Sequence, residues 1–219
     1  MGAACCKDAQ SVVPGEAPSR LPTLDADLRT SDSKLQGTGG GDSSHSDVEA
    51  SRLFTLGQNY EKGLEGMPKE PSKAFECFLQ AAELGHTRAE IRVGFYYDVG
   101  FGCSEDPERA AYWYRKAAAK NEPKALFSLG LCYAKGIGVA KDEVEALKLF
   151  AQSAELGYDR AIYNLGYCYE QGIGCAQDLS RAMVLYRRAC DAGNAFARQR
   201  LGLFAARDGQ EAQVDAPAA

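Results

Sequence analysis

The chain repeats itself at an interval of 36 residues, and this period constrains the fold more than any other feature. The repeat is marked by Gly57, Gly94, Gly130, Gly166 and Gly202, of which only the first lies one residue out of phase. Two further columns keep the same period, namely Ala89, Ala125, Ala161 and Ala197, and Gly85, Asn121, Gly157 and Gly193. Such a period is typical of stacked supersecondary units, none of which buries its apolar face alone. A chain of this kind is expected to work through an exposed surface.

Each unit has the pattern of a helical hairpin. In residues 125–161 the first half carries apolar residues at helical spacing, and Gly136 and Gly138 then allow the backbone to reverse. Asp142 stands where a helix N-cap belongs, and the second helix should end near Gly157. The equivalent cap positions hold Asp106 and Asp178, whereas the first unit has the poorer cap Glu70 followed by Pro71. The sequence therefore predicts helix, tight turn, helix and a short link in every unit.

These motifs resemble the Sel-one-like repeat (SLR) family, a variety of tetratricopeptide-like repeat. The resemblance rests on Leu-Gly, a tyrosine three residues later, Gly-x-Gly, an aspartate, and then alanines around an apolar or aromatic pair. The third unit shows it as Leu129-Gly130, Tyr133, Gly136/Gly138, Asp142, Ala146, Leu149-Phe150 and Ser153-Ala154. The resemblance covers roughly residues 48–207. It implies an all-α fold, a right-handed α-solenoid of about four helix-turn-helix units with a terminal capping helix, in proteins that act as adaptors or scaffolds.

The two ends of the chain differ from the repeats. Residues 8–45 are rich in Ser, Gly and acidic side chains, and they are predicted to form a disordered linker because they offer little apolar surface to bury. The solenoid is predicted to span residues 46–207, with Ser46 and Glu49 forming a capping box at its first helix. Residues 208–219 lack apolar periodicity and are predicted to form a disordered tail.

Residues 1–7 form a candidate lipidation motif. Gly2 becomes the amino terminus once Met1 is removed, as N-myristoylation requires, although Cys6 replaces the usual Ser or Thr at that position. Cys5 and Cys6 resemble palmitoylation sites, and a second acyl chain is needed because one myristoyl group binds membranes only marginally. The motif predicts attachment to the cytosolic face of a membrane. The alternative is a cytoplasmic protein with two incidental cysteines, and no secretory signal or membrane-spanning stretch is visible.

The other candidate reactive residues fit structural roles better. Six of the eight cysteines occupy apolar or turn positions of the repeat, and no Cys-x-x-Cys pair is present. The only histidines, His45 and His86, have no set of ligands or nucleophile near them in sequence. The Gly-x-Gly triplets do not follow strands, so a turn explains them better than a phosphate loop. We therefore expect no metal, no cofactor and no catalytic residues.

A candidate binding groove can be placed by counting from the marker glycines. Six residues before them lies a basic column of Arg88, Lys124 and Arg160. Three residues before lies an apolar column that includes Phe127 and Tyr163, and one residue after lies a third column of Phe95, Leu131 and Tyr167. A basic column beside apolar columns suits an extended peptide with acidic groups or a C-terminal carboxylate. The alternative is that the aromatic rings pack between repeats and the basic side chains are simply solvated.

The predicted function is that of a non-enzymatic adaptor or scaffold that binds a protein or peptide and is tethered to a membrane. One alternative is a soluble adaptor for a chaperone, degradation or signalling complex. A hydrolytic enzyme is a weaker alternative, because no nucleophile and base are seen together. Nucleic acid is an improbable partner, since the net charge is −5 and the sequence pI is about 5.2.

Overall fold

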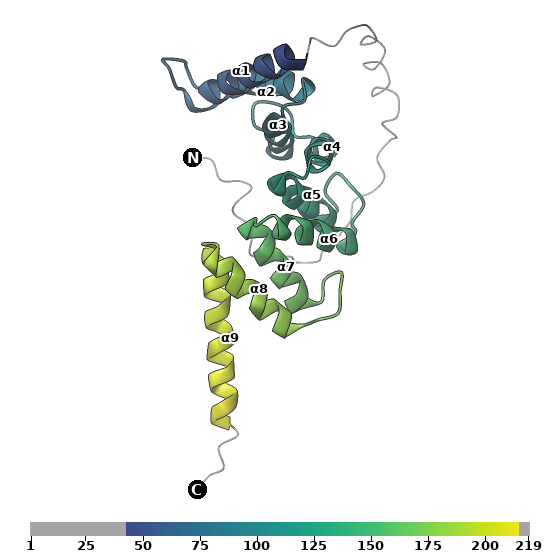
Figure 1. Ribbon diagram of the computed structural model, residues 1–219, viewed down its shortest axis with the longest axis vertical. Coiled ribbons are helices and arrows are strands. Elements are labelled where there is room, and N and C mark those ends of the chain that lie inside the picture. Colours follow the sequence, from purple (N-terminus) through teal and green to yellow (C-terminus); the bar gives the residue numbers. More distant parts are fainter. Residues whose placement is uncertain (1–42, 215–219) are drawn as a thin grey trace.

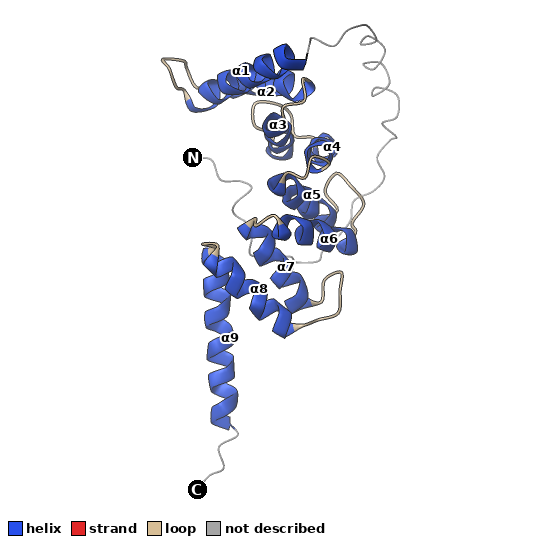
Figure 2. Ribbon diagram, in the orientation of Figure 1, coloured by secondary structure: helices blue, strands red, loops and turns tan. Residues whose placement is uncertain are grey.

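The computed structural model describes residues 43–214, and within them every regular element is a helix (Figure 2). The helices are α1 (Ser43–Lys62), α2 (Pro71–Glu83), α3 (Thr87–Val99), α4 (Pro107–Ala118), α5 (Pro123–Lys135), α6 (Glu143–Glu155), α7 (Asp159–Gln171), α8 (Leu179–Asp191) and α9 (Ala195–Val214). The predicted all-α fold of helix-turn-helix units is confirmed.

The helices form four hairpins that follow one another along the long axis of the molecule (Figure 1). Each helix packs chiefly against the helices before and after it in the chain. The odd-numbered helix is the first of each hairpin and the even-numbered helix is the second. Helix α9 is a further first helix that packs against α8 and continues beyond the stack. This nearest-neighbour arrangement is characteristic of solenoids.

The predicted N-caps are confirmed. The side chains of Asp106, Asp142 and Asp178 accept hydrogen bonds from backbone N–H groups in the first turns of α4, α6 and α8. Glu70 precedes α2 without a side-chain cap bond, as expected for a poorer cap. Because an N-cap satisfies donors that the helix itself leaves open, these aspartates define where each second helix begins.

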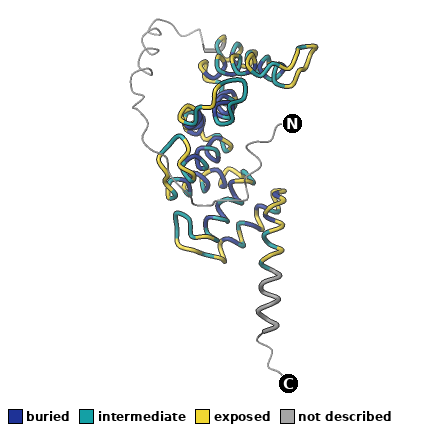
Figure 3. Tube along the Cα trace, turned by 180° about the vertical axis from the view of Figure 1, so that it is seen from behind, coloured by how far each residue is buried: buried dark blue, intermediate teal, exposed yellow. Residues whose placement is uncertain are grey.

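The marker glycines allow the two helices of a hairpin to approach closely. A Cβ placed on Gly130 would lie 2.7 Å from Cε1 of Phe150, a buried ring of α6. The same relation joins Gly57 to Phe78, Gly94 to Tyr114 and Gly166 to Tyr186. These four rings belong to the apolar core. Buried residues recur in each hairpin along the stack (Figure 3).

The second glycine of each turn has a role beyond chain reversal. Gly102, Gly138 and Gly174 have positive φ, as predicted. In addition, a Cβ on Gly138 would overlap the carbonyl oxygen of Pro107, at the start of the second helix of the preceding hairpin. Gly102 and Gly174 meet Pro71 and Glu143 in the same way. The turns therefore dock each hairpin onto the one before it.

Both ends of the solenoid differ from the predicted boundaries. Helix α1 begins at Ser43, so Ser46 lies inside the helix and does not cap it. Helix α9 continues to Val214, past the predicted end at residue 207. Once the packed first turns have nucleated a helix, further residues add at little cost, and Gln210, Glu211 and Ala212 are good helix formers.

The candidate lipidation residues Gly2, Cys5 and Cys6 lie outside the described residues, as does most of the predicted linker. Among the described residues, no helix combines the length and apolar character needed to cross a membrane.

Candidate protein-interaction surface

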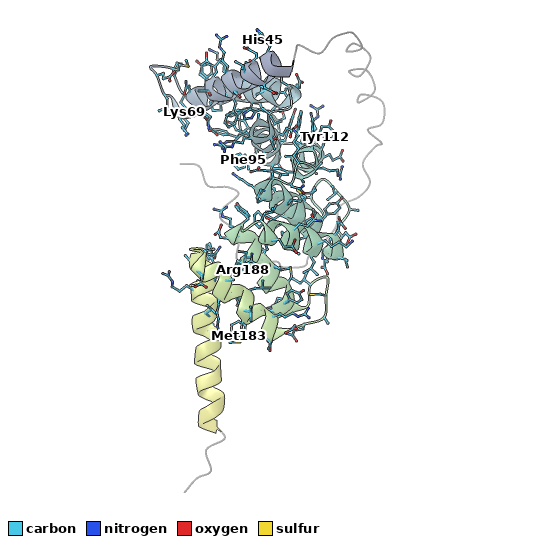
Figure 4. All side chains as sticks on the ribbon, viewed as in Figure 1. His45, Lys69, Phe95, Tyr112, Met183 and Arg188 are labelled. Carbon is cyan, nitrogen blue, oxygen red and sulfur yellow. The ribbon has the colours of Figure 1, made fainter. Side chains whose placement is uncertain are left out.

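Three repeat positions on the first helices of the hairpins form a strip of exposed and half-buried side chains. They lie six and two residues before the marker glycine and one residue after it, a spacing that places them on a single helical face. We call this the odd-helix strip, and its members are Arg88, Arg92 and Phe95 on α3, Lys124, Ser128 and Leu131 on α5, and Arg160, Asn164 and Tyr167 on α7. Phe95 lies on the opposite side of the second hairpin from Tyr112 of α4 (Figure 4).

The basic column is the most exposed part of the odd-helix strip. Arg88, Lys124 and Arg160 are all exposed, at the same position of three consecutive hairpins. Arg92 adds a fourth positive charge one helical turn along α3. A protein with a net charge of −5 thus carries a local line of positive charge.

Ion pairs tie neighbouring first helices together beside the strip. Arg92 of α3 lies 3.1 Å from a carboxylate oxygen of Glu61 on α1. At the other end, Arg200 of α9 lies 3.5 Å from a carboxylate oxygen of Glu170 on α7, and its guanidinium lies 5.6 Å from the ring centre of Tyr167. These ion pairs join α3 to α1 and α7 to α9, so they flank the odd-helix strip at its two ends.

The same carboxylates also hold buried tyrosines. Tyr96 donates a hydrogen bond to Glu61 at 3.2 Å, and Tyr186 donates one to Glu170 at 2.5 Å. Burial, with the nearby carboxylate, raises the pKa of both phenols well above the usual range. Both tyrosines therefore remain protonated donors and act as structural contacts.

The predicted apolar column three residues before the marker glycine belongs to the core. Phe127 is only 9% exposed and packs against Phe150 and Tyr158, with ring centres 5.8 and 5.3 Å away. Tyr163 packs between Tyr186 and Phe196 at 5.5 and 6.2 Å. The alternative interpretation, that these rings pack between helices, holds for this column.

The column one residue after the marker glycine remains partly open. Phe95, Leu131 and Tyr167 are half-buried, so each packs one side of its side chain against the core and leaves the other side accessible. Of the eight residues predicted to line a groove, six lie on the odd-helix strip, whereas Phe127 is buried and Tyr163 is half-buried against neighbouring rings.

The column two residues before the marker glycine was not predicted from the sequence. Arg92 on α3 and Arg200 on α9 share this repeat position, and Ser128 and Asn164 fill it on the two first helices between them. The recurrence of arginine at this repeat position could have indicated the column from the sequence. Their acidic partners carried no signal, because Glu61 and Glu170 lie about 30 residues away in sequence.

A buried carboxylate distinguishes the second hairpin. Glu90 is 0% exposed and occupies the position that Leu126 and Ile162 fill in the next two hairpins. Lys120 lies 2.9 Å and Lys116 3.6 Å from its Oε1 atom. Lys120 also donates to the carbonyl of Gly85 at 2.8 Å. A buried charge requires such partners, so this cluster is a structural link between α3 and α4.

The thiols of the repeat positions behave as apolar groups. Burial raises the pKa of Cys168 to about 12, and it also raises the pKa values of Cys77, Cys103 and Cys175. A thiol with a raised pKa forms little of the reactive thiolate at neutral pH. Within residues 45–204, no group of three or more His, Cys, Asp or Glu side chains is arranged to hold a metal ion.

The stacked hairpins define a helical-repeat protein of the α-solenoid class. The Sel1 repeat model matches the chain four times, over residues 53–86, 87–122, 123–158 and 159–194. The chain therefore belongs to the Sel1-repeat family, and each matched segment corresponds to one hairpin with its following link.

Two solved structures are similar to this chain. One is a protective antigen of uropathogenic Escherichia coli with an SLR fold, at 35% identity and a TM-score of 0.70 over 75% of this chain and 35% of the antigen. The other is a Sel1 repeat protein from Oxalobacter formigenes, at 33% identity and a TM-score of 0.67 over 71% of this chain and 63% of that protein. The match thus spans less than two thirds of either relative. A comparison with curated proteins finds no match.

Proposed function

We propose that this protein is a binding scaffold whose odd-helix strip takes an extended peptide bearing acidic groups. The observation that carries the proposal is the repetition of exposed positive charge, Arg88, Lys124 and Arg160, beside half-buried apolar side chains. Regularly spaced cations pair with carboxylates, while apolar positions supply contact area and specificity. Membership of a repeat family that binds proteins agrees with this proposal.

The test uses an array of synthetic peptides, in which acidic and neutral sequences carry either a free C-terminal carboxylate or an amide. The purified chain should bind acidic peptides preferentially. The triple variant Arg88→Glu, Lys124→Glu and Arg160→Glu should lose this preference, because it reverses the charge of the whole column.

A matched control reverses three basic residues on second helices, namely Lys73→Glu, Lys148→Glu and Arg187→Glu. This variant has the same change in net charge, yet it leaves the strip intact. It should keep the binding of the unmodified chain. Equal losses in both triple variants would mean that net charge governs binding, and binding that survives both would exclude the strip.

We further propose that N-terminal acylation holds the scaffold near a membrane. The support is the sequence Met1-Gly2-Ala3-Ala4-Cys5-Cys6, in which the candidate sites for two kinds of acyl chain are close together. Two acyl chains anchor a protein far more stably than one, so the pair is worth testing as a unit.

Cell fractionation tests this anchor. The chain with a C-terminal tag should sediment with membranes in eukaryotic cells, and both Gly2→Ala and the double variant Cys5→Ser, Cys6→Ser should shift it to the soluble fraction. An unmodified chain found entirely in the soluble fraction would favour the soluble adaptor instead.

A further inference from the structure

Helix α9 keeps the sequence of a first helix and lacks the second helix that such a helix packs against elsewhere in the described structure. In each of the four hairpins, a ring of the second helix covers the marker glycine. At Gly202, by contrast, an added Cβ would have no atom of the described residues within 4 Å. The face of α9 around Gly202 is therefore open.

One flank of the open face carries large apolar side chains, and the other flank carries small residues. We define the α9 face as Ala195, Phe196, Gln199, Gly202 and Leu203, all of them exposed and spaced so that they share one side of the helix. Phe196 is 48% and Leu203 56% exposed, and they lie on the same flank of this face. Ala195 and Gly202 form the other flank, with Gln199 between the two.

The first half of α9 is held against α7 and α8, so the face has a fixed shape. Asn194 accepts a hydrogen bond from Ala197 and donates one to Asp159 at the start of α7. Phe204 packs against Tyr186 of α8, with ring centres 6.1 Å apart. A preorganised face loses little conformational freedom when another helix docks on it.

We propose that the α9 face is a self-association surface, on which α9 of a second copy of this chain packs antiparallel about a twofold axis at Gln199. Such an axis brings together residues on the same flank that lie nearly as far before Gln199 as after it, here three residues on one side and four on the other. Phe196 of each copy then meets Leu203 of the other, and Ala195 meets Gly202.

The pairing satisfies the physical requirements of a helix interface. The large residues cover one another on one flank, and the small residues let the two backbones approach on the other, as the marker glycines do inside each hairpin. At the axis, the two Gln199 amides present a donor and an acceptor to each other. An isologous contact of this kind closes on itself, which makes a dimer the expected assembly.

Arg198 borders the small flank and would lie near its counterpart in the second copy. The two guanidinium groups repel one another at low ionic strength. Measurements are therefore made in about 0.5 M salt, where the Debye length is only a few ångströms and this repulsion is screened.

Sedimentation velocity of the full chain over a wide concentration range tests the proposal. The unmodified chain should show a monomer–dimer equilibrium, and Leu203→Glu should weaken the dimer at least tenfold. The control Val184→Glu places the same charge on an exposed position of α8, 62% exposed and outside the α9 face. It should leave the dimer unchanged. Circular dichroism of both variants should match the unmodified chain, since both positions are exposed.

Cross-linking tests the geometry separately. Under oxidised glutathione, Gln199→Cys should form a disulfide-linked dimer well above the background of the native cysteines, because the two positions meet at the axis. Ala192→Cys, which is exposed in the link before α9, should not exceed that background. A chain that is monomeric at every concentration, a dimer indifferent to Leu203→Glu, or equal cross-linking of both variants would overturn the proposal.

Discussion

Gly130 and Gly202 hold the same position of the repeat and experience opposite surroundings. Gly130 lies against the ring of Phe150, where a Cβ would approach to 2.7 Å, whereas a Cβ on Gly202 would meet nothing within 4 Å. Glycine is required at position 130 because α6 packs against it, whereas no second helix of the described structure packs against α9 at Gly202. The marker glycine therefore identifies a first helix of the repeat. The second helix that packs against it determines whether glycine is required at that position.

The contrast extends along both helices. Phe127 of α5 is buried between Phe150 and Tyr158, and the equivalent residue of α9 is the exposed Gln199. Helix α9 thus carries a polar residue at the repeat position that is buried in α5, while the apolar Phe196 and Leu203 lie exposed on one flank of its open face. Four comparisons between substitutions test how the repeat units differ from one another.

The largest effect is expected where one inner hairpin docks onto another. Gly138→Ala should lower the free energy of unfolding by about 3 kcal/mol or more, since the new Cβ would overlap the Pro107 carbonyl and the residue has positive φ. Gly157→Ala also substitutes at positive φ but has no atom within 4 Å, so it should cost only about 1–2 kcal/mol. Urea unfolding of both variants measures the difference. Similar losses would show that the turn does not lock the hairpins together.

The second-largest effect on stability is expected at Glu90, which is buried in the second hairpin at a position where the next two hairpins have an apolar residue. Lys120→Met should destabilise the chain by about 2 kcal/mol, because Glu90 would keep only the more distant Lys116. Glu90→Leu restores the apolar residue of the neighbouring hairpins and should change the stability by less than about 1 kcal/mol. Denaturant titration compares the two. A greater loss in Glu90→Leu would mean that the ion cluster stabilises the second hairpin in its own right.

The third effect is the change in stability when a marker glycine is replaced by alanine, which should be unfavourable in the third hairpin and favourable in α9. Gly130→Ala should lower the stability by about 1–2 kcal/mol through overpacking against Phe150. Gly202→Ala should raise it by up to about 1 kcal/mol, since alanine favours helices and the added methyl group enters open space. Thermal melts at low protein concentration measure both. A destabilised Gly202→Ala variant would show that a further chain segment already covers this glycine.

The smallest effect compares the caps of α3 and α9. His86 Nδ1 accepts a hydrogen bond from Ala89 N at 3.2 Å, and burial lowers the pKa of this histidine. The folded state thus favours neutral His86, so the cap contributes fully above the ordinary histidine pKa of about 6.5 and is lost as pH falls through the lowered value. Melting temperatures should fall between neutral and mildly acidic pH.

Asparagine supplies the matched variant for this cap. Asn194 holds the equivalent position before α9 and accepts from Ala197 N at 3.1 Å without titrating. His86→Asn should therefore remove part of the acid-dependent loss of stability while preserving the cap. An unchanged pH dependence would assign the loss to other groups.

Much of the molecule could be read from short-range sequence patterns. The 36-residue period gave the hairpins, Asp106, Asp142 and Asp178 gave the starts of the second helices, and the positive-φ glycines gave the turns. Each of these features depends on residues close together in the chain. For the candidate site, the same counting located the basic column and the half-buried column that follows the marker glycine.

Repeat positions counted from the marker glycine do not distinguish the buried side of a helix from its exposed side when apolar residues occur on more than one face. Phe127 and Tyr163 share a column with other apolar residues, which predicts both for the groove, and only the neighbouring rings show that they pack against other parts of the repeat. Arg92 was overlooked for the opposite reason, since its register holds Ser128 and Asn164 in the inner hairpins.

The sequence alone determined the repeat, the helix boundaries within each hairpin and the identity of the turns, because local backbone preferences and capping bonds act over a few residues. The tertiary structure decided which column is buried, how Glu90 is neutralised, where the first helices are tied by Glu61 and Glu170, and that Gly202 faces open space. These outcomes depend on contacts between segments about 30 residues apart, and the energy of such a contact exists only once both segments are packed in place.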